Sequence, residues 1–290
     1  DIPFAESEDI PFERYVPDLG ASHQRLQALA ALRGEIKGVK KPLVVASIRA
    51  ATQATLERAA FDSSTHLLSV RDRINPEAQV RQWLDMGYSH EPTVEIPGTI
   101  SRRGGILDIF PVSRDRPVRI ELFDDEIETI RHFDPGTQRS TGKIRSITIP
   151  PARETLPRLA SEDRVQELLG AMELIGTSEE AQRRIPSDLS QMLAGESLDE
   201  VSFYAGFFNL GNIFDYLSAE SLMVVLRPGA IEEISRSLDR RLVQLRSAKE
   251  KRGDVPAGFA QPHIEWGFIS DAMNARPKSV NLSPWGVDSE

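Results

Sequence analysis

The densest group of side chains that could do acid–base chemistry is a short run of carboxylates, Asp124, Asp125, Glu126 and Glu128. Paired carboxylates act as acid and base only where their surroundings give them different affinities for protons. The residues on both sides of this run alternate between apolar and polar, which predicts a hairpin with the carboxylates at its tip. Water at the tip would keep all four ionised, so the sequence predicts a solvated turn and no catalytic or metal-binding pair.

Patterns for nucleotide or metal binding find no match. The nearest approach to a phosphate-binding loop, Gly136, Gly142 and Lys143, has five intervening residues and is followed by Ile144 in place of Ser or Thr. The histidines are scattered singly, without a pair at helical ligand spacing: His23, His66, His90, His132 and His263. We therefore expect no catalytic residue, no metal ligand and no cofactor-binding residue, and hence no enzyme activity in this chain alone.

Composition narrows the classes of function further. The 290 residues are 40% hydrophobic and carry a net charge of −9, with no cysteine. The charge argues against non-specific binding to nucleic acid, which needs clustered Lys and Arg. No apolar run is long enough to span a membrane, and the absence of cysteine is compatible with the cytoplasm, which is the expected location. The start at Asp1, without a leader, predicts a processed product or a fragment of a larger protein.

The first part of the chain has the pattern of a parallel α/β layer. A helix is expected from Ser22 to near Gly34, followed by a buried strand at Leu43–Ala46 and a second helix at Ala50–Ala60. The chain after Pro150-Pro151 is mostly helical, and its two strand-like stretches, Leu222–Leu226 and Val280–Leu282, are expected to resume the same layer.

The middle of the chain has a different pattern. A strand near Leu67 and a helix beginning at Pro76 precede closely spaced strand segments, which predict an antiparallel meander. These segments are Thr93–Ile96, Gly105–Phe110, Val118–Phe123, Glu126–Phe133 and Ile144–Ile149. The predicted organisation is therefore an α/β domain of residues 1–65 and 150–290, with a small domain of residues 66–149 inserted into it.

The strand at Val118–Phe123 supplies the candidate binding residues. Its alternation should point Val118, Ile120 and Leu122 into the core, leaving Arg119, Glu121 and Phe123 together on the outer face. Arginine beside an exposed aromatic ring is the composition of an interface hot spot. Between Thr99 and Arg119, five arginines face two aspartates, which gives a local charge of +3 on an acidic chain. The alternative reading is structural: Phe123 folds over the sheet edge into the core, and Arg119 pairs with a neighbouring carboxylate.

These segments resemble a known family. SRRGGILDIFP (residues 101–111), PVRIELFDDEIETIRHFD (117–134) and TQRS (137–140) are together similar to the module shared by bacterial transcription-repair coupling factors and the excision nuclease B subunit, UvrB. The coupling factors fit better, because residues 15–18 run almost directly into the helix at Ser22 and leave no room for the long hairpin of UvrB. Weaker similarity extends over 10–18, 43–50, 149–154, 201–208 and 213–226.

The resemblance implies a fold, a partner and contact residues. The fold would be a degenerate helicase-like α/β domain with an inserted domain of antiparallel sheet plus helix, and the inserted domain would bind the excision repair A subunit, UvrA. The implied contact residues are Arg103, Arg119 and Phe123, whereas Arg102 has no counterpart in the family.

The parent protein implied by the resemblance is an ATP- and Mg²⁺-dependent DNA translocase that contacts RNA polymerase and DNA through other parts. Its motor domains are a further expected partner of this module. The alternative is a fragment of a UvrB-like subunit that binds damaged DNA.

Overall fold

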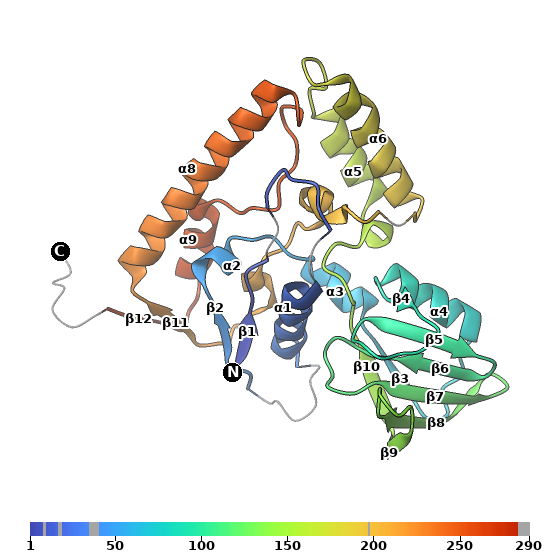
Figure 1. Cartoon of the computed structure of the whole chain (residues 1–290). Helices are drawn as coiled ribbons and strands as arrows, with labels where there is room; N and C mark the ends of the chain where they lie inside the picture. Colours follow the sequence, from blue (N-terminus) through green and yellow to red (C-terminus); the bar gives the residue numbers. More distant parts are fainter. Residues whose placement is uncertain (8–9, 17–18, 35–40, 197, 284–290) are drawn as a thin grey trace. The chain divides into compact units, whose positions relative to one another are not determined.

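The computed structural model describes residues 1–7, 10–16, 19–34, 41–196 and 198–283. Helices and short strands are mixed in its first part, a run of strands follows from β4 to β10, and most of the rest is helical (Figure 1). The predicted α/β class is confirmed, with several separate sheets. The chain divides into two compact units, one of residues 1–3, 18–44 and 58–160 and the other of residues 4–17, 45–57 and 161–290. The proposed domain bounds, 1–65 and 150–290 around 66–149, stay a prediction.

A six-stranded sheet dominates the first unit. Its spatial order is β4-β5-β6-β7-β8-β9, with β4 parallel to β5 and all later neighbours antiparallel. The strands are β4 (Ser89–His90), β5 (Thr99–Arg103), β6 (Ile106–Ile109), β7 (Val118–Phe123), β8 (Glu126–Phe133) and β9 (Ser140–Ile144). The predicted meander is confirmed for β6, β7 and β8.

Three details of the meander differ from the prediction. Residues 93–96 form no strand, because Pro92 and Pro97 flank them and proline donates no ladder hydrogen bond. β5 and β9 were not predicted, and β9 is polar and exposed, so it lacks the apolar alternation that marks a strand. β10 (Ser146–Ile149) belongs to a different sheet, in which it pairs antiparallel with β3 (His66–Ser69).

Helix α4 (Pro76–Asp85) lies against β5 and begins as predicted at Pro76. Asn75 caps it by accepting hydrogen bonds from the amides of Glu77 and Ala78, both at 3.0 Å. Trp83 on this helix is fully buried, as are the inward residues of the central strands: Ile100, Leu107, Ile109, Val118, Ile120 and Ile130. The first unit also contains α1 (Leu19–Leu32), α3 (Arg58–Ser64) and η1 (Pro157–Leu159).

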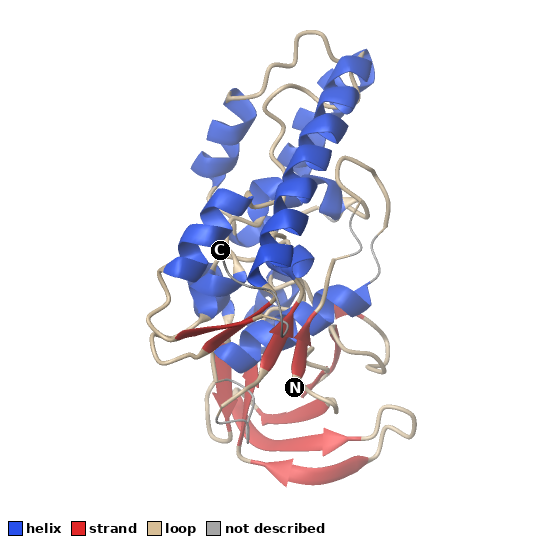
Figure 2. Ribbon diagram, turned by 90° about the vertical axis from the view of Figure 1, so that its left-hand side faces the viewer, coloured by secondary structure: helices blue, strands red, loops and turns tan. Residues whose placement is uncertain are grey.

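The second unit is largely helical (Figure 2). Its helices are α2 (Ile48–Ala51), α5 (Glu162–Gly170), α6 (Glu179–Leu193), η2 (Val201–Tyr204), α7 (Ala205–Phe208), η3 (Ile213–Tyr216), α8 (Pro228–Arg252) and α9 (Trp266–Asn274). Strands β11 (Met223–Leu226) and β12 (Ser279–Leu282) pair in parallel. Aromatic rings of Phe203, Tyr204, Phe207 and Phe259 pack together in the core, with centroid separations of 4.9 to 6.3 Å.

Predictions for the α/β layer were partly wrong. The helix expected at Ala50–Ala60 is broken, because the backbone of Thr55 exchanges hydrogen bonds with Gly211. The strand expected to be buried, β2 (Val44–Ala46), pairs with β1 (Ile2–Phe4) and leaves Val45 54% exposed. Among the described residues, β11 and β12 form a sheet of their own and do not join β2.

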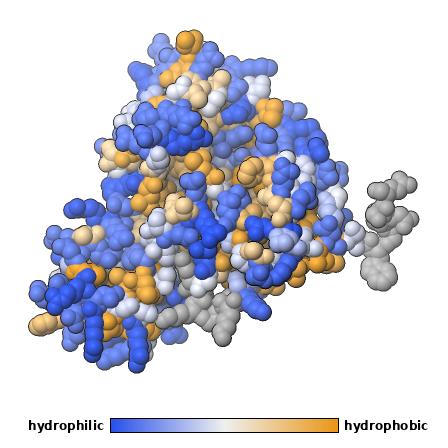
Figure 3. Space-filling model, turned by 180° about the vertical axis from the view of Figure 1, so that it is seen from behind, coloured by the Kyte–Doolittle hydropathy of each residue, from blue (hydrophilic) through white to orange (hydrophobic). Residues whose placement is uncertain are grey.

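On the side seen in Figure 3, several patches of hydrophobic residues are interspersed with hydrophilic ones. No helix among the described residues is both long and apolar enough to cross a membrane.

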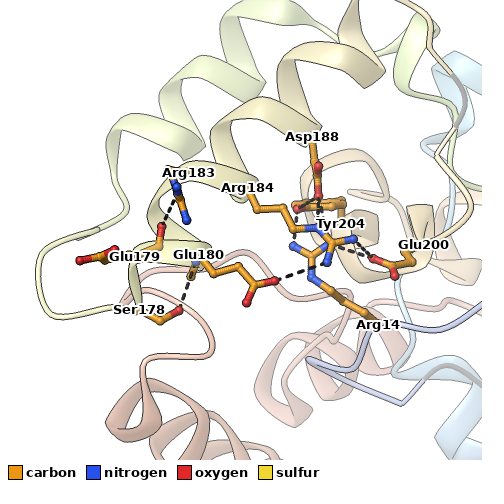
Figure 4. Close-up of polar contacts among 10 residues, drawn as sticks. Arg14, Ser178, Glu179, Glu180, Arg183, Arg184, Asp188, Glu200 and Tyr204 are labelled. Atoms are coloured by element: carbon orange, nitrogen blue, oxygen red, sulfur yellow. Dashed lines mark hydrogen bonds and ion pairs between the residues drawn. The ribbon is translucent and has the colours of Figure 1, made fainter.

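Arg14 is the centre of a polar cluster in the second unit (Figure 4). Its guanidinium lies 3.0 Å from carboxylate oxygens of both Asp188 and Glu200 and donates to the Tyr204 hydroxyl at 2.7 Å. It also lies 4.1 Å from the centre of the Phe203 ring. One side chain thus fixes the segment at residue 14 against α6 and η2. Burial raises the pKa of Tyr204, so the hydroxyl stays protonated and donates to Asp188.

We expect Arg14→Ala to lower the free energy of unfolding by about 2–3 kcal/mol, because it takes one cation from two partly buried carboxylates and removes the contact with Phe203. Chemical denaturation followed by far-UV circular dichroism measures this. Arg183→Ala is the matched control, since Arg183 is exposed and its hydrogen bond among the described residues is to the carbonyl of Glu179. Its effect should stay within about 0.5 kcal/mol. Equal effects of the two variants would contradict the structural role of the cluster.

A second prediction concerns pH. His66 Nε2 accepts a hydrogen bond from the Trp83 indole N–H at 3.1 Å, so Nδ1 carries the proton and donates to the carbonyl of Ser64. Burial lowers the pKa of His66 below 6.5. The folded state therefore binds fewer protons at His66 than the unfolded state does. The contribution of neutral His66 to the free energy of unfolding is present above pH 6.5 and is lost as pH falls below it.

Thermal melts at about pH 7.5 and about pH 5 test this. The Tm should fall less between the two pH values in His66→Gln than in the wild type. His90→Gln, at an exposed position in the same unit, should behave as the wild type. An unchanged pH dependence in His66→Gln would contradict the assignment.

Candidate interaction surface

The strand register defines which side chains share the face of the six-stranded sheet that carries Arg119. Cross-strand partners in an antiparallel sheet lie on the same face. One row across the strands is Arg103, Ile106, Glu121 and Thr129, and the adjacent row is Ser101, Asp108, Arg119, Arg131 and Lys143. We call these residues, with Phe123, the outer face. The predicted candidates Arg103, Arg119 and Phe123 are thus brought to one face of the sheet.

Phe123 is the most exposed large apolar residue of the outer face, with 76% of its surface accessible. The β7–β8 register shifts between Glu121 and Leu122, so that Leu122 pairs with the buried Ile127. Phe123 follows Glu121 in the alternation of β7 and faces outward. The reading in which Phe123 folds into the core is wrong.

The hairpin tip that carries Phe123 is fixed in place. Asp124 adopts φ +58°, as a tight hairpin turn requires. The amide of Ile74 donates to the carbonyl of Asp125 at 2.8 Å, and Arg73 lies 3.4 Å from the Asp125 carboxylate. The predicted carboxylate run therefore lies at the hairpin tip, as expected, and an exposed ring on such a fixed strand end loses little entropy on binding.

Arg119 pairs with a carboxylate, as the structural alternative predicted. Its Nε and Nη2 each lie 2.8 Å from an oxygen of Asp108, which is only 3% exposed. The hydrogen bonds to Asp108 raise the pKa of Arg119 above its usual value. The guanidinium also donates to the carbonyl of Gln138 at 3.3 Å and lies 4.8 Å from the centre of the Phe133 ring. Arg119 therefore presents only part of its guanidinium to a partner.

Arg103 lies at the exposed end of β5. Its Nη2 donates to the carbonyl of Pro92 at 2.5 Å. Gly104, at φ +59°, turns the chain into β6, and Gly105 contacts β7 so closely that an added Cβ would lie 3.2 Å from the carbonyl oxygen of Leu122. Ile106, directly opposite Arg103, is 36% exposed. Arg103, Ile106 and Phe123 thus offer a partner one cation and two apolar contacts.

Arg102 has its place on the opposite face, where its guanidinium lies 3.4 Å from Glu77 of α4. It is therefore not part of the outer face. Among the described residues, no group of three or more His, Asp or Glu side chains is arranged to hold a metal ion.

Sequence reasoning missed Ile106, Asp108 and Gln138. The sequence could have identified Asp108, because a single carboxylate between Leu107 and Ile109 in a strand predicts a buried charge that needs a partner. The sequence could not have identified Gln138. Its side-chain amide donates to the carbonyls of Val94 and Pro135 from a backbone at φ +58°, which residue types do not predict.

Part of the chain matches a known protein family. Residues 67–154, which include α4, the six-stranded sheet and the outer face, match the family described as the UvrB interaction domain.

The chain as a whole is similar to the transcription-repair-coupling factors, as the sequence motifs predicted. It is 29% identical to the protein of Myxococcus xanthus over 286 residues, 96% of this chain and 23% of that protein. Identity is 30% with the Bacillus subtilis protein (77% of this chain, 19% of that protein) and 28% with the Haemophilus influenzae protein (95% and 23%). The chain thus spans about a fifth to a quarter of the length of these relatives.

A double-mutant cycle tests the role of the Asp108–Arg119 pair. Asp108→Ala should lower the free energy of unfolding by about 3 kcal/mol, because it leaves a partly buried guanidinium without its carboxylate. With Arg119→Leu as the second change, the coupling energy from urea denaturation should be about 1–3 kcal/mol.

Glu77→Ala is the control, since its pair with Arg102 is exposed and should contribute less than about 1 kcal/mol. Additive effects of Asp108→Ala and Arg119→Leu would show that the pair does not organise the face.

Proposed function

We propose that this chain is the N-terminal module of a transcription-repair-coupling factor, which recruits the excision repair A subunit, UvrA, to lesions at stalled RNA polymerase. The observation that carries the proposal is the outer face, with its exposed Phe123, in the region that matches the UvrB interaction domain. The similarity of the chain to transcription-repair-coupling factors supports the same assignment.

The outer face has the physical features of a binding hot spot. An exposed ring on a fixed hairpin, a neighbouring Ile106 and the cation of Arg103 combine apolar area with one directional charge. Phe123 and Arg103 are the direct contacts in this proposal. Arg119 contributes through the exposed edge of its guanidinium and by holding β6, β7 and the turn at Gln138 together.

The module acts in this proposal without catalysis and without a cofactor of its own. ATP and Mg²⁺ would be used by motor domains elsewhere in a longer cytoplasmic protein, whose remaining parts contact RNA polymerase and DNA. The motor domains would also be able to dock onto this module. The second unit, with its parallel β11–β12 pair and surrounding helices, fits the remnant of a helicase-like α/β domain.

Binding of the purified chain to UvrA, measured by pull-down and by titration calorimetry, tests the proposal. Phe123→Ala should weaken binding by about 2 kcal/mol, roughly thirtyfold, because it truncates the central apolar contact. Arg103→Ala should weaken it by about tenfold.

Phe268→Ala is the matched control, because Phe268 is a 60% exposed aromatic residue of α9 outside the outer face. Undiminished binding by both Phe123→Ala and Arg103→Ala would contradict the site. Tight, salt-dependent binding of the chain to damaged DNA would favour the UvrB-like alternative.

A further inference from the structure

The free edge of the six-stranded sheet is β9, which is exposed along most of its length. It pairs with β8 on one side only and is the last strand in the sheet order, as Figure 1 shows. Ser140, Thr141, Gly142 and Lys143 are all exposed. An exposed edge strand presents backbone N–H and C=O groups that can pair with a further strand.

The charge along this edge is entirely positive. Residues 137–145 contain Arg139, Lys143 and Arg145 and no Asp or Glu, in a chain with a net charge of −9. Within the part of the chain that the structure describes, none of these three side chains forms an ion pair. An extended segment lying along β9 would therefore meet three cations that form no ion pair with any described residue.

The cross-strand register indicates that at least one of these charges is uncompensated. Arg119, Arg131 and Lys143 are successive partners across β7, β8 and β9, and like charges in such positions destabilise a sheet. Arg119 is offset by Asp108 at 2.8 Å and Arg131 by Glu121 at 3.5 Å. Lys143 has no such partner among the described residues, so a carboxylate supplied from outside would relieve the repulsion.

The turn before β9 holds the edge in place. Gln138 donates from its backbone amide to the carbonyl of Asp134 at 2.8 Å, and Thr137 donates to the Asp134 carboxylate at 2.7 Å. The backbone then joins β8 through the amide of Asp134 and the carbonyl of Arg139, at 2.9 Å. The TQRS motif at residues 137–140 thus sets the start of β9.

We propose that β9 is a docking edge for an extended acidic segment of a partner protein, which adds to the sheet as a further antiparallel or parallel strand. Backbone pairing would supply the affinity, and Arg139, Lys143 and Arg145 would select acidic side chains. This inference does not depend on the identity of the partner that the outer face binds.

Titration of the full chain with a synthetic peptide of alternating glutamate and valine tests the inference. Its binding should weaken by about tenfold or more in Lys143→Glu combined with Arg145→Glu, and also as salt is raised. Arg81→Glu, an exposed charge reversal on α4, is the control and should leave the affinity unchanged. Melting temperatures show that each variant is folded.

Hydrogen exchange separates strand addition from loose charge attraction. The bound peptide should slow exchange of β9 backbone amides, whereas a peptide with prolines in place of the valines should not bind. Absence of slowed exchange, or binding that survives Lys143→Glu with Arg145→Glu, overturns the proposal. Tighter binding of a single-stranded oligonucleotide at β9 than of the acidic peptide would also overturn it.

Phe123→Ala distinguishes this edge from the outer-face contact. The acidic peptide should bind Phe123→Ala as it binds the wild type, whereas UvrA binding should fall. Loss of peptide binding in Phe123→Ala would show that no separate edge site exists, and would leave the proposed UvrA contact standing.

Discussion

The ion pair between Asp108 and Arg119 is the interaction on which the outer face depends. It joins β6 to β7 through two hydrogen bonds of 2.8 Å, and the same guanidinium reaches the turn at Gln138. A carboxylate as buried as Asp108 would be costly without this partner. The pair therefore fixes the central strands relative to the turn that begins β9.

The surrounding contacts make the outer face a fixed surface. Asp125 and Ile127 beside the hairpin tip are hydrogen-bonded to residues 71–74, and Arg103 is hydrogen-bonded to the carbonyl of Pro92. These bonds order the side chains before any partner arrives, which lowers the entropic cost of binding. The arrangement suits a module that acts by presenting a surface.

The sequence predicted the central strands and the face because alternation is a local property. Val118–Phe123 showed its alternating inward and outward residues, and Pro76 marked the start of α4. It could not predict features that depend on distant contacts. The break after α2 depends on Gly211, and the partner of Arg119 depends on the β6–β7 register. The exposed β9 has no apolar pattern, so residue types alone could not identify it.

The two adjacent arginines at the end of β5 point to opposite faces of the sheet. Arg102 faces α4 and Arg103 faces solvent, because side chains alternate along β5 and the turn at Gly104–Gly105 sets its register with β6. Insertion or deletion of a single residue there would exchange them and bring the wrong guanidinium to the surface. The pair of glycines therefore preserves the register of the hairpin. The two neighbouring arginines keep opposite orientations, one toward α4 and one toward solvent.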